Sequence, residues 1–219
     1  AEMAKLAETT YRDVNIGLAN QFAKFADRTG IDVYAVIEAC NSQPYSHIHQ
    51  PGVAVGGHCI PVYPRLYLHN DPEATVVAAA REANAGMPEY TVQQLEAEYG
   101  DLSGASVAVL GAAYRGGVKE TAFSGVFPLV AALNGRGAQV VVNDPMYTDA
   151  ELSAFGWQPY RLGDPVDAAI VQADHTEYRS LAPNDLPGVR VVVDGRRVLP
   201  SDFGAKVVEI GAADASRRS

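Results

Sequence analysis

The first part of the chain alternates apolar and polar positions with the period of an α-helix. Between residues 2 and 29 the apolar residues recur at steps of three and four, which predicts one long helix with an apolar stripe. The stripe consists of Met3, Leu6, Val14, Leu18, Phe22 and Phe25. Gly30 is expected to end this helix, and Asp32 to cap a second helix from Val33 to about Cys40.

Further along, residues 73–99 are rich in alanine, with Arg, Glu and Gln interspersed, which predicts a second long helix. Gly86 and Pro88 interrupt this stretch, and we expect the helix to bend or break there. The intervening segment 41–50 has the composition of a loop.

From Gly104 onward the pattern changes to short apolar runs separated by turn residues. The runs are 107–110, 139–143, 168–171, 189–193 and 207–210, and a helix is expected over about 124–134. Strands that alternate with helices predict a doubly wound parallel sheet, whose ligands lie at the carboxyl ends of the strands. Tyr114-Arg115 and Arg196-Arg197 follow two of these runs.

The chain is therefore expected to be an α/β protein of two parts. A helical domain over residues 1–102 is followed by a Rossmann-like α/β domain over residues 103–219, and the second long helix joins them. Residues 212–219 are expected to be disordered.

Composition narrows the possible partners. The 219 residues carry 17 basic and 26 acidic side chains, a net charge of −9, which argues against nucleic acid or an acidic membrane surface as partner. No apolar run has membrane-spanning length, and no signal-peptide pattern opens the chain. The two cysteines, Cys40 and Cys59, fit a reducing compartment, so a cytoplasmic protein is expected.

One cysteine lies in a glycine-bearing loop, Pro51-Gly52-Val53-Ala54-Val55-Gly56-Gly57-His58-Cys59-Ile60-Pro61. Glycines let a backbone approach a ligand closely, and Pro61 resists helical continuation after Cys59. Such a cysteine is either a small buried apolar residue or a reactive thiol. Upstream, Lys5, Thr9 and Arg12 share one helical face, which is either a solvated surface or part of a site.

A zinc site is a further alternative. Cys40, His47, His49, His58 and Cys59 are all possible ligands. No C-x-x-C accompanies them, and the adjacent pair His58-Cys59 suits one tetrahedral ion poorly, so no metal is expected.

Several motifs together resemble the UDP-glucose/GDP-mannose dehydrogenases, a family of NAD-dependent nucleotide-sugar 6-dehydrogenases. The motifs are Glu2-Met3-Ala4-Lys5-Leu6-Ala7-Glu8, Tyr11-Arg12-Asp13-Val14-Asn15-Ile16, Val55 to Val62, Val109 to Arg115, Asn143-Asp144-Pro145 and Asp194-Gly195-Arg196-Arg197. They follow the family's order and spacing over nearly the whole chain. In detail the chain is similar to the branch that oxidises UDP-N-acetyl-amino sugars.

The resemblance implies the last two of the family's three domains, a central helical dimerisation domain and a C-terminal UDP-sugar-binding domain. The N-terminal NAD-binding domain is expected to be absent from this sequence, which contains no G-x-G-x-x-G. The implied partners are a UDP-sugar and a second copy of the chain. The implied reaction oxidises the sugar's C6 alcohol to a carboxylate with two NAD.

The resemblance also assigns roles. Cys59 is the implied nucleophile, Lys5 stabilises an oxyanion and favours the thiolate, and Thr9 completes the catalytic set. The implied substrate-binding residues are Gln50, Pro51, Gly52, Val53, Ala54, Val55, Gly56, Tyr114, Arg115 and Arg196. Cys59, Ile60, Pro61 and Val62 match a segment that touches the nicotinamide side of NAD.

Three positions depart from the family pattern. Thr9 replaces the usual Asn, Tyr63 replaces the Asp that helps to activate the hydrolytic water, and Ala122 stands where the family has Arg. Residues 41–50 offer no clear counterpart of an Arg that precedes the cysteine. A UDP-sugar-binding or dimerisation module without catalysis is therefore the alternative to an enzyme.

Overall fold

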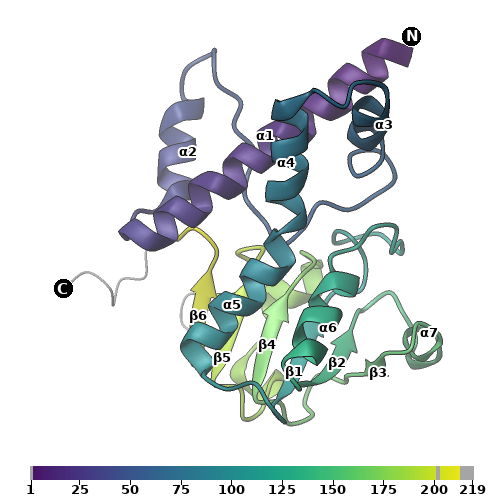
Figure 1. The fold of residues 1–219 in the computed structure, drawn as a ribbon. Coiled ribbons are helices and arrows are strands. Elements are labelled where there is room, and N and C mark those ends of the chain that lie inside the picture. Colours follow the sequence, from purple (N-terminus) through teal and green to yellow (C-terminus); the bar gives the residue numbers. More distant parts are fainter. Residues whose placement is uncertain (1, 201–202, 213–219) are drawn as a thin grey trace. The chain divides into compact units, whose positions relative to one another are not determined.

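The computed structural model describes residues 2–200 and 203–212, so most of the expected disordered tail lies outside the described residues. The chain forms two compact units, unit 1 (Ala1–Met87 with the chain from Ile210 onward) and unit 2 (Pro88–Glu209) (Figure 1). The contacts thus divide the chain at Met87, whereas the sequence pattern suggested residue 102. The second half of the helix predicted over residues 73–99 belongs with unit 2, because Glu89 and Glu96 form ion pairs with Arg136 of unit 2, at 2.6 Å and 3.0 Å.

The described part of unit 1 consists of helices and connecting loops. The helices are α1 (Glu2–Thr29), α2 (Val33–Asn41), α3 (Tyr63–Asn70) and α4 (Thr75–Ala85). As predicted, α1 ends before Gly30, whose φ is +69°. Asp32 caps α2, since its Oδ1 accepts the Tyr34 N–H at 2.9 Å.

The end of the described chain returns to unit 1 through Gly211. Its carbonyl accepts the N–H of Val33 at 2.8 Å, and its own N–H donates to Asp27 Oδ1 at 2.8 Å. A Cβ at this position would lie 2.5 Å from Val33 Cγ1 and 2.8 Å from Ala23 Cβ. Glycine is therefore needed for the chain to reach α1 and α2.

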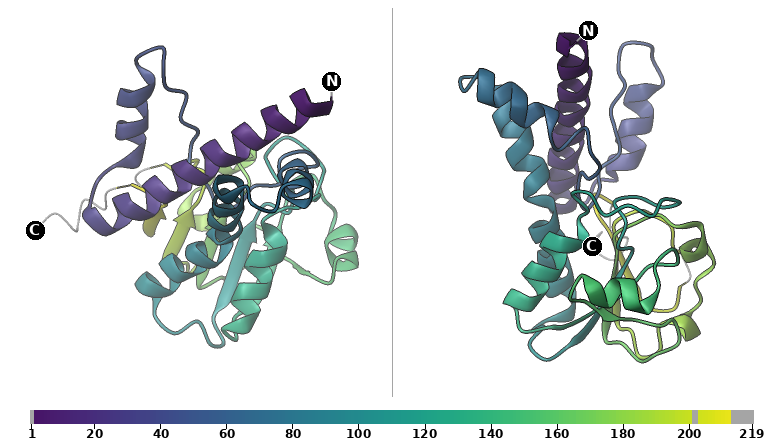
Figure 2. Two further views of the ribbon diagram at one scale, coloured as in Figure 1. Left: turned by 45° about the horizontal axis from the view of Figure 1, so that its top comes forward. Right: turned by 90° about the vertical axis from the view of Figure 1, so that its right-hand side faces the viewer.

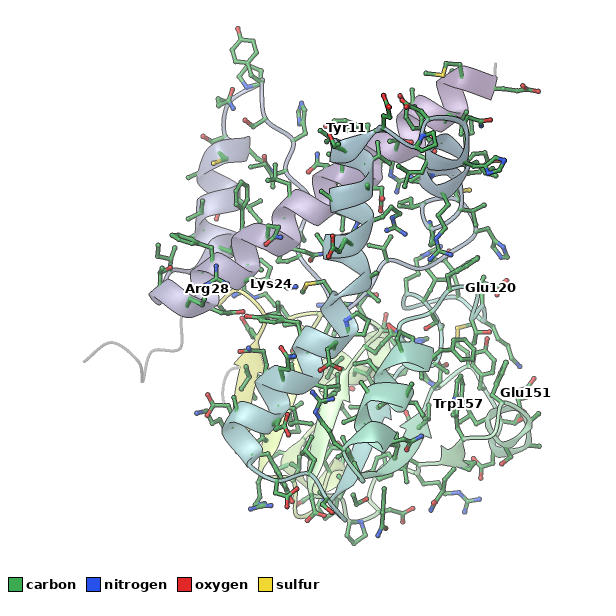
Figure 3. All side chains as sticks on the ribbon, viewed as in Figure 1. Tyr11, Lys24, Arg28, Glu120, Glu151 and Trp157 are labelled. Carbon is green, nitrogen blue, oxygen red and sulfur yellow. The ribbon has the colours of Figure 1, made fainter. Side chains whose placement is uncertain are left out.

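The apolar stripe predicted on α1 points largely outward in the single chain. Met3, Leu18, Phe22 and Phe25 are between 38% and 62% exposed, and Tyr11, labelled in Figure 3, is 57% exposed. The buried face of α1 instead carries small or polar residues: Thr9, Thr10, Asp13, Gly17, Ala19, Asn20, Ala23 and Ala26. On α1, therefore, small and polar residues pack into the core of unit 1, and the large apolar residues named above face solvent.

The second predicted helix is broken as expected. α4 ends at Ala85, and α5 (Met87–Tyr99) begins after Gly86. The sequence pattern missed α3, although Pro64 lies in its first turn, where a missing N–H costs no helical hydrogen bond. Of the described helices, none combines the length and the apolar character needed to cross a bilayer.

Unit 2 contains a parallel sheet with the strand order β3-β2-β1-β4-β5-β6. The strands are β1 (Ser106–Leu110), β2 (Gln139–Asn143), β3 (Gln158–Pro159), β4 (Ala168–Val171), β5 (Val191–Asp194) and β6 (Lys206–Glu209). The pairing is parallel throughout, with Val107 opposite Val140 and Ala168. The predicted doubly wound sheet is confirmed, and its strand order reverses between β1 and β4.

Helices cover one face of this sheet and mainly irregular segments cover the other. α5 and α6 (Val126–Gly135) lie over the same face (Figures 1 and 2). The opposite face of the sheet packs against a cluster of buried residues that includes Tyr160, Tyr178, Leu186 and Phe203. These residues come from short segments between β3 and β6, including the 3-10 turns η1 (Thr176–Ser180) and η2 (Pro183–Asp185). The sequence pattern also missed β3 and α7 (Asp149–Ala154).

Candidate functional site

Lys5 of α1 approaches the chain segment that carries Cys59 and Tyr63. The Lys5 ammonium lies 5.8 Å from the centre of the Tyr63 ring, at the start of α3. The pKa of Lys5 is raised, mainly by the hydrogen bond that Lys5 donates to Glu8. Burial acts in the opposite direction, and the charge of Glu8 and smaller electrostatic contributions from Cys59 and Tyr63 raise the pKa further. The structure therefore places the Lys5 ammonium over the ring of Tyr63, four residues after Cys59.

Glu8 competes with any ligand for that cation. Its carboxylate accepts a hydrogen bond from Lys5 Nζ at 3.0 Å and forms a longer ion pair with Arg12 at 3.5 Å. The side chains of Lys5 and Glu8 are 44% and 49% exposed, so solvent screens the pair. Lys5 can therefore turn toward an anionic oxygen at little cost.

Thr9 is less accessible than its assigned role suggests. It is fully buried, and its hydroxyl donates to the Lys5 carbonyl at 2.7 Å, with the Leu6 carbonyl at 3.2 Å. This hydrogen bond to the preceding turn of the helix occupies the hydroxyl proton. In this arrangement Thr9 can offer a ligand only the lone pairs of its oxygen.

Cys59 precedes the first turn of α3 and is half-buried. The Cys59 carbonyl accepts the N–H groups of Val62 at 3.1 Å and Tyr63 at 3.0 Å, which fixes its backbone against the helix start. Gly57 has a φ of +89°, which explains the glycine before the His-Cys pair. Of the adjoining predicted residues, Ile60 and Val62 are half-buried and Pro61 is buried.

The predicted substrate loop, residues 50–56, has an anchored half and an accessible half. Pro51, Gly52 and Val53 are buried, whereas Ala54, Val55 and Gly56 are half-buried and Gln50 is exposed. The Gly52 N–H donates to Asn20 Oδ1 at 3.0 Å. The part of the loop that can meet a ligand is therefore Gln50 together with Ala54–Gly56.

Two more asparagines hold the chain that leads into this loop. Asn15 accepts the His49 N–H at 2.9 Å and donates to the His47 carbonyl at 2.6 Å. Asn41 pairs with both the N–H and the carbonyl of Ile48, at 2.8 and 2.9 Å. The sequence pattern gave Asn20 and Asn41 no role, and Asn15 was noted only within a motif.

The remaining predicted residues lie in unit 2, at the carboxyl ends of β1 and β5. Tyr114 is half-buried and Arg115 is exposed, with Arg115 Nε 3.4 Å from the Tyr114 hydroxyl. Arg196 Nε donates to the Gln172 carbonyl at 2.7 Å, and the Arg196 N–H donates to Asp194 Oδ1 at 3.0 Å. These positions are those expected of ligand-binding residues on a doubly wound sheet.

Gln172, which the sequence pattern missed, connects these segments. It directly follows β4, is fully buried, and donates to the carbonyls of Gly111 at 3.2 Å and Ala113 at 2.7 Å. Its amide nitrogen also lies 2.9 Å from the Ser124 hydroxyl. Because its own carbonyl accepts from Arg196, Gln172 ties the turn after β1 to the turn after β5.

A buried aspartate and histidine support the same turn. Asp144 accepts the N–H groups of Ala112 at 2.8 Å and Ala113 at 3.0 Å, and its Oδ2 lies 3.0 Å from His175 Nε2. The Gly117 N–H donates to His175 Nδ1, so Nε2 carries the proton that faces Asp144. Burial raises the pKa of Asp144, but the hydrogen bonds from His175 and the backbone outweigh it and leave the pKa lowered.

The structure brings no zinc ligands together in the described part of the chain. Within residues 2–200 and 203–212, no three His, Cys, Asp or Glu side chains lie close enough to hold one metal ion. Cys40 and Cys59 are both free thiols.

Comparison with known proteins identifies relatives of both units. The central-domain model of the UDP-glucose/GDP-mannose dehydrogenase family matches residues 1–86, and the UDP-binding-domain model of that family matches residues 108–201. A UDP-N-acetyl-D-mannosamine dehydrogenase from Pyrococcus horikoshii is 35% identical over 207 residues, which cover 91% of this chain and 48% of the relative. One from Campylobacter jejuni is 36% identical over 186 residues, 81% of this chain and 46% of the relative.

Solved structures agree with these matches. The structure of a UDP-D-ManNAc dehydrogenase from Pyrococcus horikoshii has a TM-score of 0.83 and 33% identity, and the match covers 98% of this chain and 52% of that one. A UDP-glucose dehydrogenase from Pyrobaculum islandicum has a TM-score of 0.85 and 28% identity, over 97% and 51%. The chain spans about half the length of the curated relatives it matches. With family models that match most of its residues, the chain belongs to the UDP-glucose/GDP-mannose dehydrogenase family.

Proposed function

We propose that this chain is the catalytic and nucleotide-binding part of an NAD-dependent nucleotide-sugar 6-dehydrogenase. The proposed substrate is a UDP-hexose, with an N-acetyl-amino sugar favoured because the relatives from Pyrococcus horikoshii and Campylobacter jejuni are named UDP-N-acetyl-D-mannosamine dehydrogenases. The observation that supports the proposal is the Lys5 ammonium over the ring of Tyr63, which follows the half-buried Cys59 by four residues, with Cys59 among the groups that raise the pKa of Lys5.

The proposed reaction oxidises C6 twice. Loss of a hydride and a proton turns the alcohol into an aldehyde, and the Cys59 thiolate then forms a C–S bond to the aldehyde carbon. The resulting thiohemiacetal loses a second hydride to become a thioester. Water attacks the thioester, the C–S bond breaks, the carboxylate leaves, two protons pass to solvent, and Cys59 is again a free thiolate. A thiolate suits this sequence because it both adds and leaves readily.

Lys5 supplies the positive charge that this chemistry needs. Each addition to the carbonyl carbon places negative charge on its oxygen, and a nearby ammonium stabilises that oxygen. The proposed part of Thr9 is to hold the backbone of Lys5, because its buried hydroxyl donates to the Lys5 carbonyl.

Residues of unit 2 are proposed to bind the nucleotide. Arg115 and Arg196 present guanidinium groups, which can pair with phosphate oxygens in a bidentate geometry. Tyr114 offers a ring and a hydroxyl beside Arg115. Gln50 and the segment 51–56 are proposed to enclose the sugar.

NAD is proposed as the hydride acceptor, two molecules for each sugar. The described residues fit it only in part, at the segment 59–62. The sheet of unit 2 has no tight glycine-rich turn between its first strand and helix, because residues 111–125 separate β1 from α6. Asp144, which follows β2, is buried and already bound by backbone N–H groups rather than open to a ribose. We therefore propose that a dinucleotide-binding domain outside this sequence holds the cofactor, and that the chain alone does not reduce NAD.

A UDP-sugar-binding or dimerisation module without catalysis is the second candidate. The burial of Thr9 and the replacement of an acidic residue by Tyr63 favour it. Both candidates include a homodimer, supported by the exposed apolar residues of α1. Sedimentation that shows only monomer at micromolar concentration would count against the dimer.

Protection of Cys59 from alkylation tests the proposed site. Saturating UDP-N-acetylmannosamine is expected to slow the reaction of Cys59 with iodoacetamide, followed by mass spectrometry of the cysteine peptides. Cys40, the other free and half-buried thiol, is the control in the same sample and is expected to react at an unchanged rate. Equal rates at Cys59 with and without the sugar would contradict the proposal.

A further inference from the structure

A row of buried polar side chains runs between α1 and α4 and ends on the predicted substrate loop. Arg81 of α4 pairs with the carboxylate of Asp13 through two hydrogen bonds. Asn84 Nδ2 donates to Asp13 Oδ1 at 2.8 Å, Asn20 Nδ2 donates to Asn84 Oδ1 at 2.8 Å, and Asn20 Oδ1 accepts the Gly52 N–H at 3.0 Å. Asp13, Asn20 and Asn84 are each 2% exposed or less.

A close approach of the two helices makes this row possible. A Cβ at Gly17 of α1 would lie 3.1 Å from the Cα of Ala80 in α4. Asp13, Gly17 and Asn20 are four and three residues apart, so they share one face of α1. Glycine at the contact lets short amide and carboxylate side chains bridge two helices that larger residues would hold apart.

The direction of every hydrogen bond in the row follows from the charge of Asp13. A carboxylate and a main-chain carbonyl can only accept, and Asn84 Nδ2 faces both the Asp13 carboxylate and the Asp13 carbonyl, at 2.8 and 2.9 Å. Asn84 must therefore turn its oxygen toward Asn20. Asn20 in turn presents its nitrogen to Asn84 and its oxygen to Gly52. Arg81, whose side chain is 12% exposed, balances the buried charge that sets this order.

Without this acceptor the loop would hold a buried donor without a partner. Gly52 is buried, and a buried N–H that loses its partner carries the full cost of desolvation. The hydrogen bond from Gly52 to Asn20 therefore stabilises the loop, and it forms only when the Asn20 oxygen faces the loop. The anchored residue lies two positions before the accessible segment Ala54–Gly56.

We propose that the row Arg81–Asp13–Asn84–Asn20 is a positioning device that fixes the substrate loop at Gly52. Its members do not take part in the reaction. They hold the loop backbone in the conformation that receives the sugar, and Asn84 acts on the loop only through Asn20. The assignment of a sugar to this loop rests on the proposed function, whereas the anchoring of Gly52 does not.

The test separates anchoring from stability and from ligand binding. Hydrogen exchange of the Gly52 amide is measured by NMR in Asn20→Ala and Asn84→Ala, at a temperature well below the melting temperature of each variant. Loss of one buried hydrogen bond is expected to speed this exchange about tenfold. Asn70→Ala removes an exposed amide of the same kind, and Val33→Ala weakens the core of unit 1 away from the loop. Both controls are expected to leave Gly52 exchange unchanged.

Asn84→Ala is the decisive variant, because it leaves the Asn20 and Gly52 groups in place. Exchange at Gly52 that matches the Val33→Ala control in both Asn variants would overturn the proposal. Calorimetry with UDP-N-acetylmannosamine is run on the same proteins, and about tenfold weaker binding is expected in both. Faster exchange with unchanged binding would remove the row's role in substrate positioning. If the unaltered chain binds no UDP-sugar, the proposed function fails, and the exchange data still decide whether the row anchors the loop.

Discussion

The Lys5 ammonium lies over the face of the Tyr63 ring, 5.8 Å from its centre. This distance is within the range of cation–π attraction. Because position 63 carries a tyrosine, the side chain that faces Lys5 there is an aromatic ring and not a second carboxylate beside Glu8. The ammonium is therefore less neutralised by its surroundings than it would be between two acids.

Replacement of Lys5 should slow alkylation of Cys59. Iodoacetamide reacts with an anionic sulfur, and Lys5→Gln removes a positive charge from the surroundings of Cys59, so we expect about a three- to tenfold slower reaction near neutral pH. Lys24→Gln removes a charge about 28 Å further along the same helix and serves as the control, expected to leave the rate unchanged. Equal alkylation rates of Cys59 in the two variants would show that Lys5 does not affect the thiol.

Replacement of Gln172 should lower the stability of unit 2 and weaken UDP binding. Gln172→Glu keeps the shape but turns the donor toward the Gly111 and Ala113 carbonyls into an acceptor, so we expect a loss of about 1–3 kcal/mol in unfolding free energy. UDP binding should weaken at least about tenfold by calorimetry. Gln139→Glu is the matched control, because Gln139 is exposed. Unchanged UDP affinity in Gln172→Glu would show that Gln172 does not position the ligand-binding turns.

Gly116→Ala should be destabilising, and Gly135→Ala should not. A Cβ at Gly116 would lie 2.2 Å from the carbonyl oxygen of Asp174, whereas a Cβ at Gly135 meets no atom within 4 Å. We expect Gly116→Ala to cost about 1–3 kcal/mol in denaturant unfolding and to weaken UDP binding, because Arg115 moves with its neighbour. Equal stability of the two variants would contradict this close approach.

The stability of unit 2 should depend on Glu151 in a defined pH range. The hydrogen bond from Lys119, followed by those from Thr148, lowers the pKa of Glu151 from 4.5 to about 2 (Figure 3 labels Glu151). A lowered pKa stabilises the folded state above about pH 4.5, and this contribution is lost as the pH falls toward 2. Glu151→Gln should therefore melt below the unaltered chain at about pH 6, with a difference that shrinks from about pH 4.5 to about pH 2.

The control for this pH dependence is Glu177→Gln, a change of the same kind at an exposed position. It should shift the melting temperature of the chain far less at about pH 6. A constant difference between Glu151→Gln and the unaltered chain across the pH range would contradict the lowered pKa.

The sequence predicted the strands well because central strands of a parallel sheet are buried on both faces and form continuous apolar runs. β2 (Gln139–Asn143) and β4 (Ala168–Val171) have the predicted bounds, β1 begins one residue earlier than predicted, and β5 and β6 are displaced by one or two residues at each end. β3 was missed because two residues carry no periodic signal. For α7 a signal was present, the capping box formed by Thr148 and Glu151.

The residues that support the site were harder to find from the sequence. The resemblance pointed to Lys5, Cys59, Tyr114 and Arg196 through local motifs. Asn20 and Gln172 act on segments that are distant in sequence, and a single Asn or Gln has no spacing pattern that marks its partner. The outward direction of the α1 stripe was equally hidden, because helical periodicity shows that a face is apolar but not what covers it.

Whether this chain binds a nucleotide sugar can be measured by calorimetric titration with UDP, UDP-N-acetylmannosamine, UDP-N-acetylglucosamine, UDP-glucose and GDP-mannose. We expect this chain to bind UDP and one UDP-N-acetyl-amino sugar more tightly than GDP-mannose, and we expect Arg115→Ala and Arg196→Ala to weaken the binding of UDP and of that sugar. If none of the five compounds binds to this chain, the proposed function is wrong.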